Sequence, residues 1–218
     1  MTPPVLLLHG IWMRGFTLAL LARRLRARGH AVACLDYASV AGAPARALDR
    51  IARRLEGLAD GGPVHLVGHS LGGLLAVQAA CRDALPAGSR VLCLGTPLAG
   101  SAVARALAGR RSLRWSLGGA RDLLCRGAEA LPGQVPVAMV AGSLPLGFGA
   151  LVPGLSGPHD GTVAVAETRH PGLAGHAVLR TSHSGLLLSA QAAGLAASWL
   201  AGQGLPAAPP DGLASGLG

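Results

Sequence analysis

The sequence predicts an α/β fold whose sheet has about six, mostly parallel strands with helices on both faces. Short, almost continuously apolar runs are typical of parallel strands buried on both sides, and here they alternate with longer stretches of helical apolar spacing. Such alternation is typical of consecutive βαβ units. The expected strands are residues 5–8, 31–35, 64–67, 90–94, 135–141 and 176–180.

Four main helices are expected between and after these strands. Apolar stripes predict the first two at residues 18–25 and 48–58, a third follows Ser70, and the last runs from 184 to 200. Arginines of the first two helices lie opposite the apolar stripe, as is usual for a solvated face. If the first strand is central and the second pairs on one side of it, a ligand site forms beyond the carboxyl ends of strands one and three.

Length and composition indicate a globular chain with a sizeable core. The 218 residues fit a single domain, expected at residues 1–201, with a small cap segment at 100–134 and a disordered tail at 202–218. Half of the residues are hydrophobic, which excludes an intrinsically disordered protein.

The charge is strongly basic. The formal net charge is +9, and all 19 basic residues are arginine. A basic protein attracts nucleic acids and anionic membranes. One tyrosine and two phenylalanines leave little to stack on bases, so nucleic acid is not an expected partner. A weak contact with an anionic membrane surface stays a hypothesis, and nothing in the sequence predicts the oligomeric state.

The cysteines do not predict a metal site. Cys34, Cys81, Cys93 and Cys125 lack the paired spacing of metal ligands. Cys34 and Cys93 lie in strand-like apolar runs, where we expect buried free thiols. The N-terminus has no signal-peptide pattern and the uncharged stretch 130–158 is broken by prolines, so we expect a cytoplasmic protein without a membrane span.

The motif Gly68-His69-Ser70-Leu71-Gly72 lies between an expected strand and an expected helix. G-x-S-x-G in this context is typical of a nucleophile elbow, whose sharp turn lifts the serine hydroxyl clear of the sheet. Side chains at Gly68 and Gly72 would collide with the neighbouring strand and helix. The alternative is a glycine-rich turn with Ser70 as a helix N-cap. The agreement of strand, turn and helix favours a nucleophile.

Together with two further segments, this motif resembles the α/β-hydrolase superfamily, in particular compact bacterial lipases and esterases. His9-Gly10-Ile11-Trp12 resembles their oxyanion loop, and residues 95–101 resemble the segment after the strand that follows the elbow. The resemblance covers about residues 5–200 and implies a minimal α/β-hydrolase fold that lacks the first two strands of larger members. It also implies that the amides of Ile11 and Leu71 form the oxyanion hole.

The general base should be a histidine that follows the nucleophile and the acid in the chain. His183 lies just after the last expected strand and just before the last expected helix. This placement favours His183 as the base. The alternatives are His159, His170 and His176.

The acid of the triad should lie between Ser70 and His183. Asp160 follows the fifth expected strand, and residues 158–163 resemble the D-G-x-V acid loop of the superfamily. An Asp-Gly turn without catalytic role is the structural alternative. The other candidate acids are Asp122, Glu129 and Glu167, of which Asp122 falls in the cap segment and Glu167 in a stretch expected to be solvated.

These residues predict a serine hydrolase that cleaves carboxylic esters through an acyl-enzyme, with no metal and no organic cofactor. The expected triad is Ser70, Asp160 and His183. Acyl or thioester transfer on the same triad, and a non-catalytic binding module on a hydrolase scaffold, are the alternatives.

The expected partner is a small-molecule acyl ester with an apolar acyl chain. The apolar loop at residues 142–153 follows the fifth strand, so it should border the site and contact the chain. Packing of this loop against the segment 100–131 is an equal alternative. The predicted substrate contacts are Trp12, Leu98, Phe148 and Leu151.

Overall fold

In the computed structural model of the protein, residues 2–82, 85–147 and 155–205 are described. Within them, six strands form one sheet in the order β2-β1-β3-β4-β5-β6, and every pairing is parallel. This confirms the predicted sheet, including the reversal of strand order at β1. The strands are β1 (Val5–Leu8), β2 (Val32–Leu35), β3 (His65–His69), β4 (Val91–Leu94), β5 (Val137–Gly142) and β6 (Gly175–Leu179).

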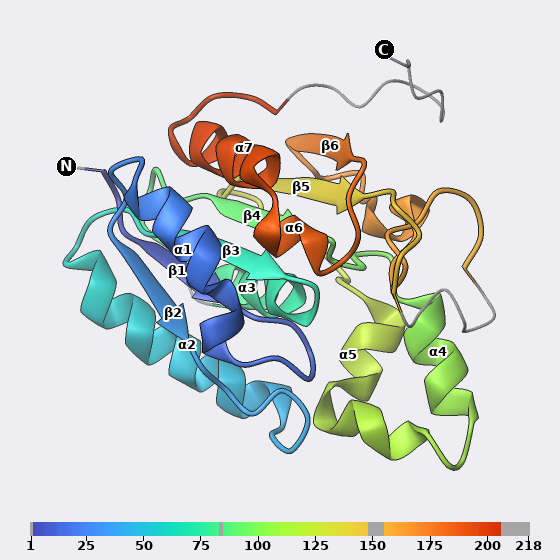
Figure 1. Ribbon diagram of the computed structural model, residues 1–218. Coiled ribbons are helices and arrows are strands. Elements are labelled where there is room, and N and C mark those ends of the chain that lie inside the picture. The colour runs from blue at the N-terminus through green and yellow to red at the C-terminus, as the bar shows by residue number, and fades with distance from the viewer. Residues whose placement is uncertain (1, 83–84, 148–154, 206–218) are drawn as a thin grey trace, which may run out of the picture.

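Helices cover both faces of the sheet, as predicted (Figure 1). The side chains of β1 show why its sequence is apolar at every position. Val5 and Leu7 belong to one core cluster with α1 and α7, and Leu6 and Leu8 belong to another with α2 and α3. The main helices are α1 (Ala19–Arg26), α2 (Pro44–Ala59), α3 (Leu71–Arg82) and α7 (Ala190–Leu200). Within the described ranges, no helix has the length and apolarity needed to cross a bilayer.

The last expected helix is broken into two. The short helix α6 (Gly185–Leu188) and α7 are separated at Ser189, whose backbone is extended. The hydroxyl of Ser189 accepts a hydrogen bond from Ala192 N at 3.1 Å and so caps the start of α7. Helical periodicity continues across this position, which is why the pattern alone predicts one helix.

The two cysteines expected inside the sheet have different environments. Cys93 on the central strand β4 is buried as predicted, and burial raises the pKa of its thiol to about 12. The prediction that Cys34 is buried is wrong, because β2 is an edge strand and leaves this side chain exposed. An apolar run therefore does not distinguish an edge strand from a central one.

The cap segment, residues 100–134, leaves the sheet after β4 and returns before β5. Ser101 begins its first helix by accepting a hydrogen bond from Ala104 N at 3.1 Å. Figure 1 shows α4 and α5 extending side by side from the carboxyl-end edge of the sheet. The elements of the cap are α4 (Ala102–Gly109), η2 (Arg114–Ala120) and α5 (Arg121–Arg126). The described residues also contain the short helices η1 (Gly15–Leu18) and η4 (Val165–Thr168).

Candidate active site

Ser70 occupies a strained turn between β3 and α3. Its φ is +54°, a left-handed conformation that side chains other than glycine rarely adopt and that costs about 1 to 3 kcal/mol. The backbone is held on both sides, because Ser70 N donates to Leu94 O at 2.9 Å and Ser70 O accepts from Gly73 N at 3.0 Å. These two hydrogen bonds fix the serine at the carboxyl end of the sheet.

The glycines of the motif allow α3 to approach the strands closely. A methyl group on Gly72 would lie 2.4 Å from Leu8 O, and one on Gly68 would lie 2.3 Å from Gly72 O. A methyl group on Gly73 would meet the Thr96 hydroxyl at 1.9 Å. The predicted collisions at Gly68 and Gly72 are confirmed, and no other residue type fits this turn without moving the backbone.

The loop after β1 lies directly against the elbow. A methyl group on Gly10 would be 3.3 Å from Ser70 Cβ and 3.1 Å from His69 Nδ1. Neither Ile11 nor Leu71 donates its amide to a hydrogen bond within the described residues. Ile11 follows Gly10, and Leu71 is the first residue of α3, where the helix dipole favours negative charge. The structure therefore leaves two donors unused on either side of Ser70.

His9 supports the loop after β1 through buried contacts. Its ring is fully buried and stacks on Tyr37 with 4.1 Å between the ring centroids. The Nδ1 atom lies 2.8 Å from Gly10 O, and Nε2 lies 3.2 Å from Asp36 Oδ1. The hydroxyl of Tyr37 donates to His9 O. Burial lowers the pKa of His9 more than these acceptors raise it, so the ring is a structural support without charge at neutral pH.

Asp160 and His183 form a buried pair. Asp160 is 1% exposed, and its Oδ2 accepts from His183 Nδ1 at 2.7 Å. The other oxygen, Oδ1, accepts from Thr162 N at 2.9 Å and Val163 N at 2.7 Å. A further hydrogen bond of 2.9 Å joins His183 N to Asp160 O. The carboxylate is thus fixed by two amides, and it orients the imidazole so that Nε2 is the nitrogen left for chemistry.

His69 connects the elbow to the Asp160–His183 pair. Its Nε2 donates to His183 O at 3.0 Å, and the two rings are 4.6 Å apart. Burial and the neighbouring His183 lower the pKa of His69 to about 3, so this ring is neutral. His69 therefore holds the backbone of His183 beside Ser70 without adding a positive charge there.

Gly95, which directly follows β4, lies against the Asp160–His183 pair. A methyl group on Gly95 would lie 3.1 Å from His183 Nδ1 and 3.2 Å from Asp160 Oδ2, and Gly95 is next to the Leu94 carbonyl that holds Ser70. Ser70 makes no side-chain hydrogen bond to His183 within the described residues. Catalytic hydrogen bonds of this kind often tighten only when a substrate is bound.

The alternative histidines are engaged elsewhere. His159 Nδ1 accepts from Gly161 N and His170 Nδ1 accepts from Gly172 N, each at 3.1 Å, which are contacts within their own turns. His176 Nε2 donates to the Thr168 hydroxyl at 2.8 Å. None of the three contacts Asp160 through a side-chain hydrogen bond in the part of the chain that the structure describes.

The alternative acids lie away from His183. Asp122 and Glu129 are exposed, and Asp122 pairs with Arg121 at 3.0 Å. The expectation that Glu167 is solvated is wrong, because its side chain is only 11% exposed. Glu167 accepts from Ala164 N at 2.9 Å and from Ala102 N, so it joins η4 to the start of α4.

The predicted substrate contacts differ in their placement. Trp12 is exposed, and its indole nitrogen donates to Ser116 O of the cap segment at 2.7 Å. Leu98 is 1% exposed and packs in the core with α3, so it does not face an open site. Phe148 and Leu151 lie outside the described residues.

Two site-supporting residues, Asp36 and Tyr37, escaped the sequence analysis. They directly follow β2, and β2 pairs with β1. Since the carboxyl ends of neighbouring parallel strands share one edge, the expected strand order already places them beside His9. Their position directly after the second expected strand could therefore have identified them from the sequence.

A sequence model of the alpha/beta hydrolase family matches residues 5–215, which is nearly the whole chain. The chain belongs to the alpha/beta hydrolase family. A search of curated proteins finds no match.

Solved structures agree with the hydrolase fold. The mature form of the lipase BlEst2 from Bacillus licheniformis is 21% identical with a TM-score of 0.72, and the alignment covers 85% of this hydrolase and 86% of that chain. The metagenomic carboxyl esterase MGS0156 is 17% identical with a TM-score of 0.66, over 84% of this hydrolase and 64% of that chain. A hydrolase of the alpha/beta superfamily from Xanthomonas campestris, described as putative, is 18% identical with a TM-score of 0.55, over 92% and 98%.

Proposed function

We propose that this alpha/beta hydrolase is a serine hydrolase that cleaves carboxylic esters. The observation that carries the proposal is that the strained Ser70 and the buried Asp160–His183 pair lie at one edge of the sheet, connected through His69 and Gly95. The unused amides of Ile11 and Leu71 beside Ser70 support it further, because an acyl transfer needs donors for the oxyanion.

In the proposed reaction, Ser70 Oγ attacks the ester carbonyl carbon while His183 Nε2 takes the hydroxyl proton. The amides of Ile11 and Leu71 bind the resulting oxyanion. Collapse of this intermediate breaks the bond to the alcohol, which leaves with the proton from His183. Water, deprotonated by His183, then attacks the acyl-enzyme and releases the acid. Asp160 stabilises the imidazolium in both steps.

The proposed substrates carry apolar acyl chains. Two structural neighbours, a lipase and a carboxyl esterase, are consistent with ester substrates, although at this identity the likeness indicates the fold alone. Support from this chain is the exposed indole of Trp12, which directly follows the proposed oxyanion residue Ile11. Apolar contact favours longer chains by about 0.8 kcal/mol for each buried methylene.

Active-site labelling with a fluorophosphonate, followed by a p-nitrophenyl ester series, tests the proposal. We expect wild type to be labelled and Ser70→Ala to be unlabelled, with turnover reduced by about 1,000-fold or more and an unchanged circular dichroism spectrum. Ser184→Ala is the matched control, because Ser184 is exposed beside His183 and makes no side-chain cap hydrogen bond.

Two outcomes are distinguishable. Labelling of Ser70→Ala, or turnover within about tenfold of wild type, contradicts Ser70 as the nucleophile. Values of kcat/KM that fail to rise from acetyl to octanoyl esters contradict only the apolar acyl chain.

A further inference from the structure

Among the described residues, five large apolar side chains are exposed. Each lies on a segment that follows the carboxyl end of a strand: two follow β1, one follows β4, one follows β5 and one follows β6. Ser70 likewise follows the carboxyl end of a strand, β3. Apolar side chains scattered singly are normal on a soluble surface, whereas several exposed together indicate a contact surface. The residues are Trp12, Phe16, Trp115, Leu146 and Leu188.

Two of these side chains are hydrogen-bonded to the same part of the cap segment. Trp12 is 59% exposed and Trp115 is 73% exposed. Their indole nitrogens both donate to backbone carbonyls of residues 112–116, Trp12 to Ser116 O and Trp115 to Ser112 O, each at 2.7 Å. The polar atom of each indole is therefore satisfied, and the exposed part of each ring is apolar.

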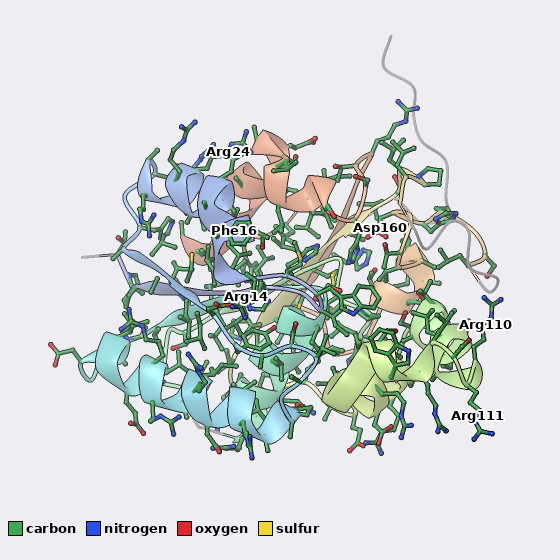
Figure 2. The ribbon with its side chains drawn as sticks, turned by 60° about the horizontal axis from the view of Figure 1, so that its bottom comes forward. Arg14, Phe16, Arg24, Arg110, Arg111 and Asp160 are labelled. Carbon is green, nitrogen blue, oxygen red and sulfur yellow. The ribbon has the colours of Figure 1, made fainter. Side chains whose placement is uncertain are left out.

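Arg110 and Arg111 lie at the start of the turn that leads into η2, and Arg114 is the first residue of η2. The turn is closed by hydrogen bonds of 2.9 Å from Leu113 N and Arg114 N to Arg110 O. Figure 2 shows the side chains of Arg110 and Arg111 extending outward from the cap. All three arginines are exposed, and none forms an ion pair with a described residue. We name Trp12, Trp115, Arg110, Arg111 and Arg114 the Trp–Arg corner.

We infer that the Trp–Arg corner docks this hydrolase on an anionic lipid surface. Indole rings settle at the level of lipid headgroups, and arginines near a bilayer are attracted by anionic lipids. A nucleic acid would satisfy the arginines but leave Leu146 and Leu188 on the same edge in water. A lipid surface accommodates both the charge and the apolar residues. Docking there requires no turnover, so it stands apart from the proposed ester hydrolysis.

The test measures co-sedimentation of the full chain with vesicles, using Ser70→Ala so that no lipid is consumed. One set of vesicles is phosphatidylcholine, and the other is an equimolar mixture with phosphatidylglycerol. We expect binding to the anionic vesicles to be at least about tenfold tighter at about 0.1 M salt, and to weaken strongly at about 0.5 M salt. Equal binding to both vesicles, or binding to neither, overturns the inference.

Charge-matched variants separate the corner from net charge. R110E/R111E/R114E is expected to weaken binding to anionic vesicles by at least about tenfold. The control R50E/R53E/R54E makes the same change of charge on exposed residues of α2 and should weaken binding less than about threefold. Equal losses in the two variants overturn the corner as the docking site. Glutamine replacements at positions 110, 111 and 114 repeat the test if the glutamate variant does not fold.

Tryptophan fluorescence gives a second readout. The third tryptophan, Trp199, is buried, so a blue shift on adding anionic vesicles reports Trp12 and Trp115. We expect Trp115→Ala to reduce both the blue shift and the affinity. An unchanged shift and affinity in Trp115→Ala overturn the role of the indole.

Discussion

The elbow around Ser70 and the Trp–Arg corner lie on the same edge of the sheet but are built in opposite ways. At the elbow, backbone atoms approach so closely that a single methyl group on Gly72 would overlap Leu8 O. At the corner, aromatic and charged side chains are exposed on a segment that is held by local backbone hydrogen bonds and by the indole of Trp12. Close packing therefore fixes the backbone at the elbow, whereas the side chains of the corner are exposed to solvent.

This difference teaches which property each region needs. Acyl transfer depends on groups held within a fraction of an ångström, which close backbone packing provides. Contact with a surface needs exposed apolar area and charge, and side chains that can adapt to it. Comparable substitutions should therefore have unequal effects on activity and stability in the two regions.

The largest contrast is expected between two aspartates. Asp160→Asn removes the buried carboxylate that orients His183, and we expect kcat/KM to fall by about 100- to 1,000-fold. Asp122→Asn, in the cap, removes only an exposed pair with Arg121 and should stay within about twofold of wild type. Steady-state kinetics on one short ester measures both. A large loss in Asp122→Asn with a normal Asp160→Asn would reverse the assignment of the acid.

Two glycines test the packing itself. Gly72→Ala should lower the free energy of unfolding by about 3 kcal/mol, because its methyl group has no space between α3 and β1. Gly109→Ala, at the end of α4, meets nothing within 4 Å and should be neutral or stabilise by up to about 1 kcal/mol. Urea denaturation monitored by circular dichroism compares the two. Similar free energies for both variants would show that the elbow is less tightly packed than described.

His69 tests positioning at the elbow. His69→Leu removes the donor to His183 O, and we expect kcat to fall about tenfold with little change in KM. His69→Gln retains an amide donor and should recover most of the loss. Because burial keeps the pKa of His69 near 3, the acid limb of the pH–rate profile should not move in the glutamine variant. A displaced limb would mean that His69 itself titrates during catalysis.

A further effect concerns acid stability. Burial lowers the pKa of His65 and His176 to about 4 and that of His69 to about 3, below the ordinary value of 6.5. Between these values the unfolded chain binds protons that the folded chain does not, so stability is present above pH 6.5 and is lost as the pH falls toward 4. We expect a loss of about 2 kcal/mol for each of these histidines by about pH 5.

His65→Asn isolates one of these protons. Asparagine can keep an acceptor for Arg90 N, which His65 Nδ1 accepts from at 3.1 Å, but it cannot titrate. Urea denaturation at two pH values should give a shallower pH dependence for this variant. The wild-type slope in His65→Asn would rule out His65 as a source of the acid sensitivity.

The sequence predicted the parts of this molecule that depend on local pattern. Continuous apolar runs gave all six strands, and the G-x-S-x-G context placed Ser70 on its turn. Chain order, placement after strands and the resemblance of residues 158–163 to an acid loop favoured Asp160 and His183 as partners, and the structure joins them at 2.7 Å. Their catalytic roles stay predictions.

Other features depend on contacts between distant segments, which a local pattern does not contain. Leu98 was expected at the substrate, but it is buried beneath α3 because the chain turns inward after β4. Glu167 lies in a polar stretch, yet it is drawn inward by the amide of Ala102, 65 residues earlier. Cys34 is exposed because its strand has a neighbour on one side only.

The hydrogen bond from Trp12 to Ser116 links the two regions mechanically. Trp12 directly follows Ile11 and has a φ of +59°, an uncommon conformation for a bulky residue. Its indole donates to the carbonyl of Ser116, the residue after Trp115. This hydrogen bond therefore tethers the loop that carries the Ile11 amide to the segment that carries the Trp–Arg corner. A displacement of the cap would therefore also pull on the loop beside Ser70. Movement of the cap away from the sheet requires this hydrogen bond to break first.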